Sequence, residues 1–162
     1  MGWRERVRRA HAARAFHVHA ALGIGASLEL IVLAQTLLLG WRDWRQIVGL
    51  TILYGLCGFA GTLAGSWTAA WLTDRAPRAT AAWAMLVGGL AMGLGALGFA
   101  LLYRSAYSQW HDPAFTVGWA VQSVFTMAGA IYYWAVLGTR LILPWAIVPL
   151  VIGALAFARR PR

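Results

Sequence analysis

An uncharged apolar segment, residues 79–103, constrains the fold of this chain more than any other feature. It is longer than the ~20 residues that cross the hydrocarbon core of a bilayer, so it predicts a membrane-spanning helix. Small residues recur along this helix and would form one row on its surface: Ala84, Gly88, Ala91, Gly95 and Gly98. A second row beside it contains Gly89, Gly93 and Ala96. Because apolar helices associate in lipid through close backbone packing, we expect neighbours on two faces of this central helix.

The composition places the whole chain in the integral membrane class. It is 60% hydrophobic with five acidic residues, and several apolar segments exceed 18 residues. All 14 basic residues are arginines, which give a net charge of +9 and lie between and beyond the apolar segments. In those positions they would face phospholipid headgroups, so we expect the bilayer as a partner and no nucleic acid. Arginine without lysine, together with many Ala and Gly, is typical of GC-rich bacterial genomes and indicates a bacterial inner membrane.

We expect a single all-α transmembrane bundle over residues 18–158. A basic amphipathic interfacial helix (1–17) would precede it, and a basic tail (159–162) would follow it. The expected spans are residues 18–39, 46–72, 79–103, 114–137 and 141–158. Residues 114–157 contain one charge and would be about 66 Å long as a single helix, twice the bilayer core. They are therefore expected to fold back at a tight turn at residues 138–140.

The arginines test this topology. Five spans with a cytoplasmic N-terminus place eight arginines inside the cell: Arg4, Arg6, Arg8, Arg9, Arg14, Arg75, Arg78 and Arg140. If residues 141–158 instead form a re-entrant segment, the tail returns to the cytoplasmic side. Eleven arginines then lie on the cytoplasmic side and three on the opposite side. The positive-inside rule favours this four-span alternative, whereas the length of residues 141–158 favours five spans. We expect five spans, with the N-terminus cytoplasmic in either case.

Glu29 is the most distinctive polar residue, because it falls near the middle of the first span. A carboxylate at that depth costs roughly 2.5–3.5 kcal/mol on insertion scales. It would serve as a proton or cation site, stay neutral and hydrogen-bonded to a neighbouring helix, or pair with a partner subunit. Gln35 lies on the same span, and Gln122 and Thr126 share one face of the fourth span. These four residues form the candidate polar site, with Gln122 and Thr126 either bonding Glu29 or lining a narrow cavity.

A further row of small residues predicts helix packing on the second span, at Gly58, Gly61 and Gly65. The pattern G-x-G-x-x-G also occurs, at residues 93–98. It lies inside an apolar segment rather than between a strand and a helix, so we interpret it as packing and not as a nucleotide site.

The sequence predicts no metal site, no catalytic residues and no resident cofactor. Cys57 stands alone in an apolar segment, and the histidines are not spaced as ligands on one helical face. Aromatic residues flank the last expected turn and are typical of an interfacial belt: Tyr132, Tyr133, Trp134 and Trp145. A bound lipid or quinone stacked on them stays open as an alternative.

We therefore expect a non-catalytic polytopic membrane protein, a small scaffold or accessory subunit. It would pack through Gly and Ala rows against itself or a larger membrane complex. The alternative is a small oligomeric transporter or channel in which Glu29 couples proton or cation movement. A third class, a lipid- or quinone-handling enzyme, would need a lateral opening near residues 110–112 or Arg140.

Overall fold

The computed structural model describes residues 3–73 and 76–160, and all regular structure within them is helical. The helices are α1 (Trp3–Ala12), α2 (Arg14–Leu38), α3 (Trp44–Leu72), α4 (Ala76–Tyr107), the 3-10 helix η1 (Ser108–Trp110), α5 (Val117–Tyr133), the π-helical turn η2 (Trp134–Gly138), α6 (Thr139–Ile142) and α7 (Ile147–Arg159). The all-helical expectation is confirmed. The predictions for residues 1–2, for residues 74–75 in the second linker and for residues 161–162 in the basic tail lie outside the described residues.

Four helical segments are long and apolar enough to cross a membrane: Arg14–Leu38, Trp44–Leu72, Arg78–Trp110 and Val117–Ile142. They correspond to the first four expected spans. The fifth expected span is represented by α7, an apolar helix of 13 residues. At 1.5 Å per residue α7 is about 20 Å long, shorter than the ~30 Å hydrocarbon core.

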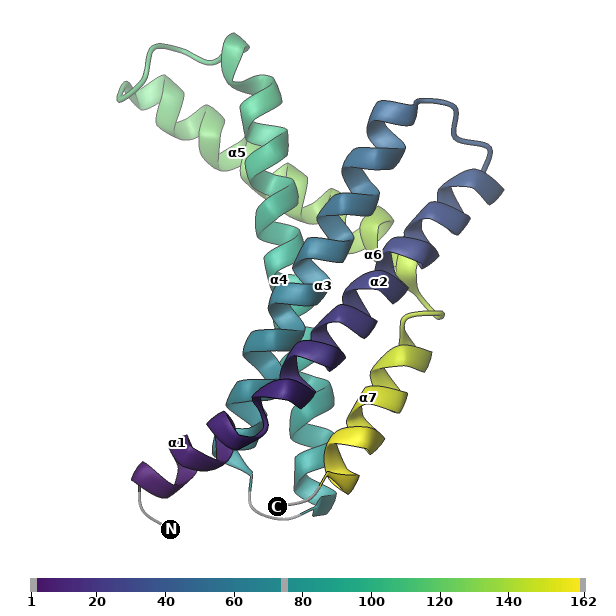
Figure 1. The fold of residues 1–162 in the computed structure, drawn as a ribbon. Helices are drawn as coiled ribbons and strands as arrows, with labels where there is room; N and C mark the ends of the chain where they lie inside the picture. Colours follow the sequence, from purple (N-terminus) through teal and green to yellow (C-terminus); the bar gives the residue numbers. More distant parts are fainter. Residues whose placement is uncertain (1–2, 74–75, 161–162) are drawn as a thin grey trace.

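The first three long helices, α2, α3 and α4, are consecutive and antiparallel (Figure 1), and α3 contacts both of the others. The turn between α2 and α3 uses Gly40, whose φ of +73° lies in the left-handed region that favours glycine. Asp43 then begins α3, because its carboxylate accepts hydrogen bonds from the backbone N–H groups of Arg45 (2.9 Å) and Gln46 (3.4 Å).

The expected central helix, residues 79–103, forms most of α4 and packs against α3, α5 and α7. The basic N-terminal helix is shorter than the expected 1–17, because α1 ends at Ala12 and α2 begins at Arg14. It lies against the end of α3, where the ring centroids of Trp3 and Trp71 are 5.3 Å apart in an edge-to-face arrangement.

The prediction of a tight turn at residues 138–140 is wrong. The helix continues through these residues from Val117 to Ile142, and the chain breaks at residues 143–146 instead. The break follows from Pro144, which lacks an N–H group and excludes helical geometry from the residue before it. Leu143 accordingly has an extended conformation, with φ −84° and ψ 142°.

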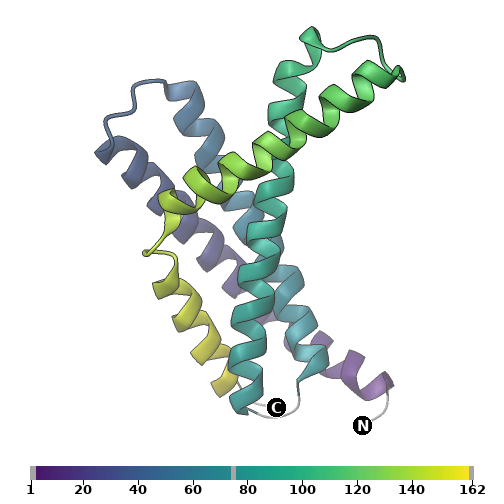
Figure 2. The same ribbon diagram turned by 180° about the vertical axis from the view of Figure 1, so that it is seen from behind.

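The break redirects the chain but does not reverse it along α4 (Figure 2). Near the C-terminal end of α4, the Arg104 guanidinium lies 5.1 Å from the ring centroid of Trp119 on α5. Near the N-terminal end of α4, Trp83 packs against Phe157 of α7 with centroids 6.1 Å apart. Residues 117–159 therefore pass once along α4, from its C-terminal end to its N-terminal end, as α5–α6 and then α7.

Candidate functional site

Glu29 lies half-buried at the interface between α2 and α3, with its carboxylate over Gly55. A Cβ atom at Gly55 would overlap the Glu29 side chain, so the absence of a side chain on α3 provides the space for this acid. Within the described residues, no hydrogen bond or ion pair joins Glu29 to another side chain. The acid also lines none of the three cavities described below.

Gln122 and Thr126 face the connection between α4 and α5. The side-chain oxygen of Gln122 accepts a hydrogen bond from the backbone N–H of Asp112 at 2.8 Å. Thr126 is 3.1 Å from the His111 ring nitrogen Nε2. In the described part of the chain α5 does not contact α2, so the structure does not bring these two residues to Glu29. They hold the α4–α5 connection in place.

The small residues named from the sequence lie where helices approach closely. On α3, Gly58 meets Leu28 of α2, Gly61 meets the backbone of Ala91 on α4, and Gly65 meets Val87 on α4. On α4, Gly88 meets Leu150 of α7, Gly95 meets Trp134 of η2, and Gly98 meets Leu53 of α3. Ala84 of α4 packs against the cluster of buried apolar residues. A Cβ at Gly65 would be 2.8 Å from the Cα of Val87, a distance that real Cβ atoms do not show. The α3–α4 contact therefore depends on bare backbone at Gly61 and Gly65.

The second row on α4 is open at Gly89 and Gly93, whereas Ala96 packs against the cluster of buried apolar residues. A Cβ at Gly89 or at Gly93 would meet nothing within 4 Å. Large exposed side chains continue this face in both directions, with Met85 77% exposed and Leu97 50% exposed. The open face of α4, meaning Met85, Gly89, Gly93 and Leu97, thus carries an unoccupied G-x-x-x-G pattern.

The α2–α3 pair and the α4–α5 pair diverge (Figure 1), and residues of all four helices line a cavity of about 600 Å³. We call it the lateral cavity. Its polar lining residues are Gln35 of α2 and Arg140 of α6. Its aromatic lining residues come from the α2–α3 turn, α3, α4, α5 and η2: Trp41, Tyr54, Phe99, Tyr103, Tyr133 and Trp134. The cavity lies beside Arg140, where the third functional class requires an opening.

One hydrogen bond and one ring stack fix the floor of the lateral cavity. The Tyr54 hydroxyl donates to the backbone carbonyl of Gly138 at 2.5 Å, and the rings of Tyr54 and Trp134 stack with centroids 4.5 Å apart. Both interactions join α3 to the π-helical turn η2. A π-helical turn often marks a functional position, because the altered register re-aims the side chains and carbonyls around it.

Sequence reasoning identified Gln35, Tyr133 and Trp134 separately, but it missed Tyr54, Phe99 and Tyr103. The sequence holds a signal for the last two, because aromatic residues recur every four residues at positions 99, 103 and 107. No local pattern links Tyr54 to Gly138, which is 84 residues away.

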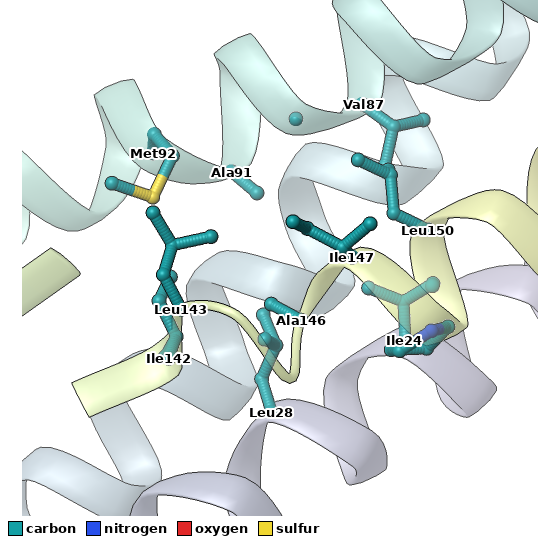
Figure 3. Close-up of a pocket in the computed structure, with 12 residues that line it drawn as sticks. Ile24, Leu28, Val87, Ala91, Met92, Ile142, Leu143, Ala146, Ile147 and Leu150 are labelled. Atoms are coloured by element: carbon teal, nitrogen blue, oxygen red, sulfur yellow. The ribbon is translucent and has the colours of Figure 1, made fainter. Parts of the chain in front are cut away.

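A second cavity, of about 170 Å³, lies beside the break between α6 and α7 (Figure 3). Ile24 and Leu28 of α2 line one side, and Val87 and Met92 of α4 line another. All of its side chains are apolar, so it offers space for hydrocarbon but no group for acid–base chemistry. A third cavity, of about 540 Å³, lies between α2 and α3 near Arg14, His17 and Trp67.

The described residues contain no group of three or more His, Cys, Asp or Glu side chains close enough to hold a metal ion. The chain matches no protein-family model, and no curated protein and no solved structure matches it either. The fold itself therefore defines the class: an all-helical protein with four helices long and apolar enough to cross a membrane.

Proposed function

We propose that this protein is a small, non-catalytic accessory subunit of a bacterial inner membrane that docks a neighbouring transmembrane helix on the open face of α4. The neighbour belongs to a second copy of the chain or to another membrane subunit. The observation that carries this proposal is the unoccupied pair Gly89 and Gly93 on α4, a helix whose other glycines, Gly88, Gly95 and Gly98, meet other helices. A G-x-x-x-G pair lets two backbones approach closely, which is how helices associate in lipid.

The proposed topology has the N-terminus in the cytoplasm and four crossings, the last built from α5–α6 and α7 together. Since α7 ends beside the beginning of α4, the arginines at the ends of the helices divide unevenly. The cytoplasmic end would hold Arg4, Arg6, Arg8, Arg14, Arg78, Arg159 and Arg160, against Arg42, Arg45 and Arg104 at the other end. This arrangement agrees with the positive-inside rule. Like the four-span alternative it returns the tail to the cytoplasmic side, but α7 is part of the fourth crossing and not a re-entrant segment.

Native mass spectrometry of the protein, extracted from its own membrane in mild detergent, tests the docking proposal. We expect a defined complex for the natural chain and its loss in the double variant Gly89→Ile/Gly93→Ile, because the branched side chains separate the backbones. Gly23→Ile is the matched control, since a Cβ at Gly23 also meets nothing within 4 Å but lies on α2. A double variant that keeps the full complex would overturn the proposal.

A further inference from the structure

Arg140 is the only charged residue between positions 113 and 158, and it lies in the last turn of the apolar segment Val117–Ile142. Within the described part of the chain, no carboxylate forms an ion pair with it. An arginine inside a membrane segment is costly unless its guanidinium reaches an anion, water or the headgroup layer. Arg140 is exposed, so an anionic partner from outside the chain can reach it, and the described residues supply none.

The surroundings of Arg140 indicate where that partner lies. Gln35, Leu39 and Trp41 line the same cavity and place it at the end of α2 that leads into the polar α2–α3 turn. Arg140 itself begins deeper, close to the break at residues 143–146, and its long side chain can extend toward lipid phosphate at this end of the cavity. The cavity then continues along apolar and aromatic walls to Phe99 and Tyr103 of α4.

We propose that the lateral cavity binds one phospholipid molecule. The lipid phosphate accepts hydrogen bonds from the Arg140 guanidinium and the Gln35 amide, and an acyl chain lies along the aromatic wall of Tyr54 and Phe99. The planar guanidinium matches two phosphate oxygens at once, which a point charge does not. The volume of about 600 Å³ is in the range of small-molecule sites and suits a headgroup with the first part of its chains.

A phospholipid fits this cavity better than a quinone does. A quinone carries no charge and would leave the Arg140 cation without a counter-ion in a low-dielectric site. The Tyr54 hydroxyl is already bonded to the Gly138 carbonyl, so it is not available to donate to a quinone carbonyl. The lipid site also uses other residues than the open face of α4, so it does not depend on the proposed docking function.

Lipid titration of the delipidated, detergent-purified protein, followed by native mass spectrometry, tests the site. The probes are phosphatidylglycerol, ubiquinone and glycerol 3-phosphate. We expect one tightly retained phosphatidylglycerol, and an affinity about tenfold lower for Arg140→Gln, the size of a lost charged hydrogen bond. Arg140→Lys should recover part of the affinity. Arg104→Gln is the matched control, because Arg104 lies against Trp119 away from the cavity.

A second variant, Leu137→Trp, fills the cavity without changing its charge and should also prevent lipid retention. It keeps the test decisive if Arg140→Gln does not fold. Equal lipid retention in Arg140→Gln or Leu137→Trp and in the natural chain would overturn the proposal. So would preferential binding of ubiquinone, which would assign a quinone site, or equally tight binding of glycerol 3-phosphate, which would assign a site for a soluble phosphate ester. If the Gly89→Ile/Gly93→Ile variant loses the protein complex but retains the lipid, the lipid site is independent of the docking face.

Discussion

The hydroxyl of Tyr54 and the backbone carbonyl of Gly138 are 2.5 Å apart, and this hydrogen bond ties α3 to the last residue of η2. Both residues line the lateral cavity, so the bond joins two of its walls. The Trp134 ring, stacked on Tyr54, strengthens the same junction. The position of Arg140, two residues beyond Gly138, therefore depends on a contact made by α3.

We expect Tyr54→Phe to lower the stability of the folded protein by about 0.5–1.5 kcal/mol, because it removes one hydrogen bond and leaves the ring stack. Thermal unfolding in detergent measures the change. Tyr132→Phe is the matched control, since the Tyr132 side chain is exposed. An unchanged melting temperature for Tyr54→Phe would show that the bond contributes nothing to stability.

Substitution of Gly61 should be more damaging. A Cβ at Gly61 would overlap the backbone of Ala91, and backbone cannot move aside as a flexible side chain does. Gly61→Val should cost about 1–3 kcal/mol or more, as overpacking does elsewhere. Gly49→Val adds the same side chain to the same helix where a Cβ meets nothing within 4 Å, so its melting temperature should stay close to that of the natural chain. Similar losses for both variants would contradict the close α3–α4 contact.

Glu29→Gln separates the accessory-subunit proposal from the transporter alternative. Because Glu29 has no partner side chain among the described residues, replacing its carboxyl group with an amide should leave the folded protein at least as stable as the natural chain. The protein complex should be at most weakened. Ion uptake into proteoliposomes that is present in the natural chain and absent in an assembled Glu29→Gln protein would instead make Glu29 a coupling carboxylate.

Cysteine labelling tests the proposed topology. In a Cys57→Ser background, Gln109→Cys should react with a membrane-impermeant maleimide in intact spheroplasts, whereas Trp3→Cys and Arg159→Cys should react only after permeabilisation. The reason is that α7 ends beside the beginning of α4, at the same end as α1. Labelling of Arg159→Cys in intact spheroplasts would support five crossings.

The first half of the fold could be predicted closely from the sequence. The expected spans 18–39 and 46–72 differ from α2 and α3 by a few residues at their ends. Long apolar segments separated by Gly40, tryptophans and charges leave little choice where a helix must begin and end.

The second half could not be predicted in the same way. Gly138 and Thr139 are tolerated in a membrane helix, so the helix continues through them. The chain changes direction at Pro144 instead. Hydropathy is uninformative there, because both sides of the break are apolar. The lateral cavity also escaped prediction, since it brings Gln35, Tyr54 and Arg140 together from three distant parts of the chain.

The break at residues 143–146 has a consequence for how the last part of the chain is held in place. Its backbone groups stay bonded through the change of direction, with Leu143 N–H donating to Thr139 at 2.9 Å and Ala146 N–H donating to Ile142 at 2.8 Å. A bend in lipid with few bare amides carries little penalty and can persist. It divides one passage along α4 into two parts that are held separately: α7 packs on α4 through the contact of Phe157 with Trp83, whereas η2 is tied to α3 by Tyr54. A substitution that removes one of these contacts would therefore leave the other in place.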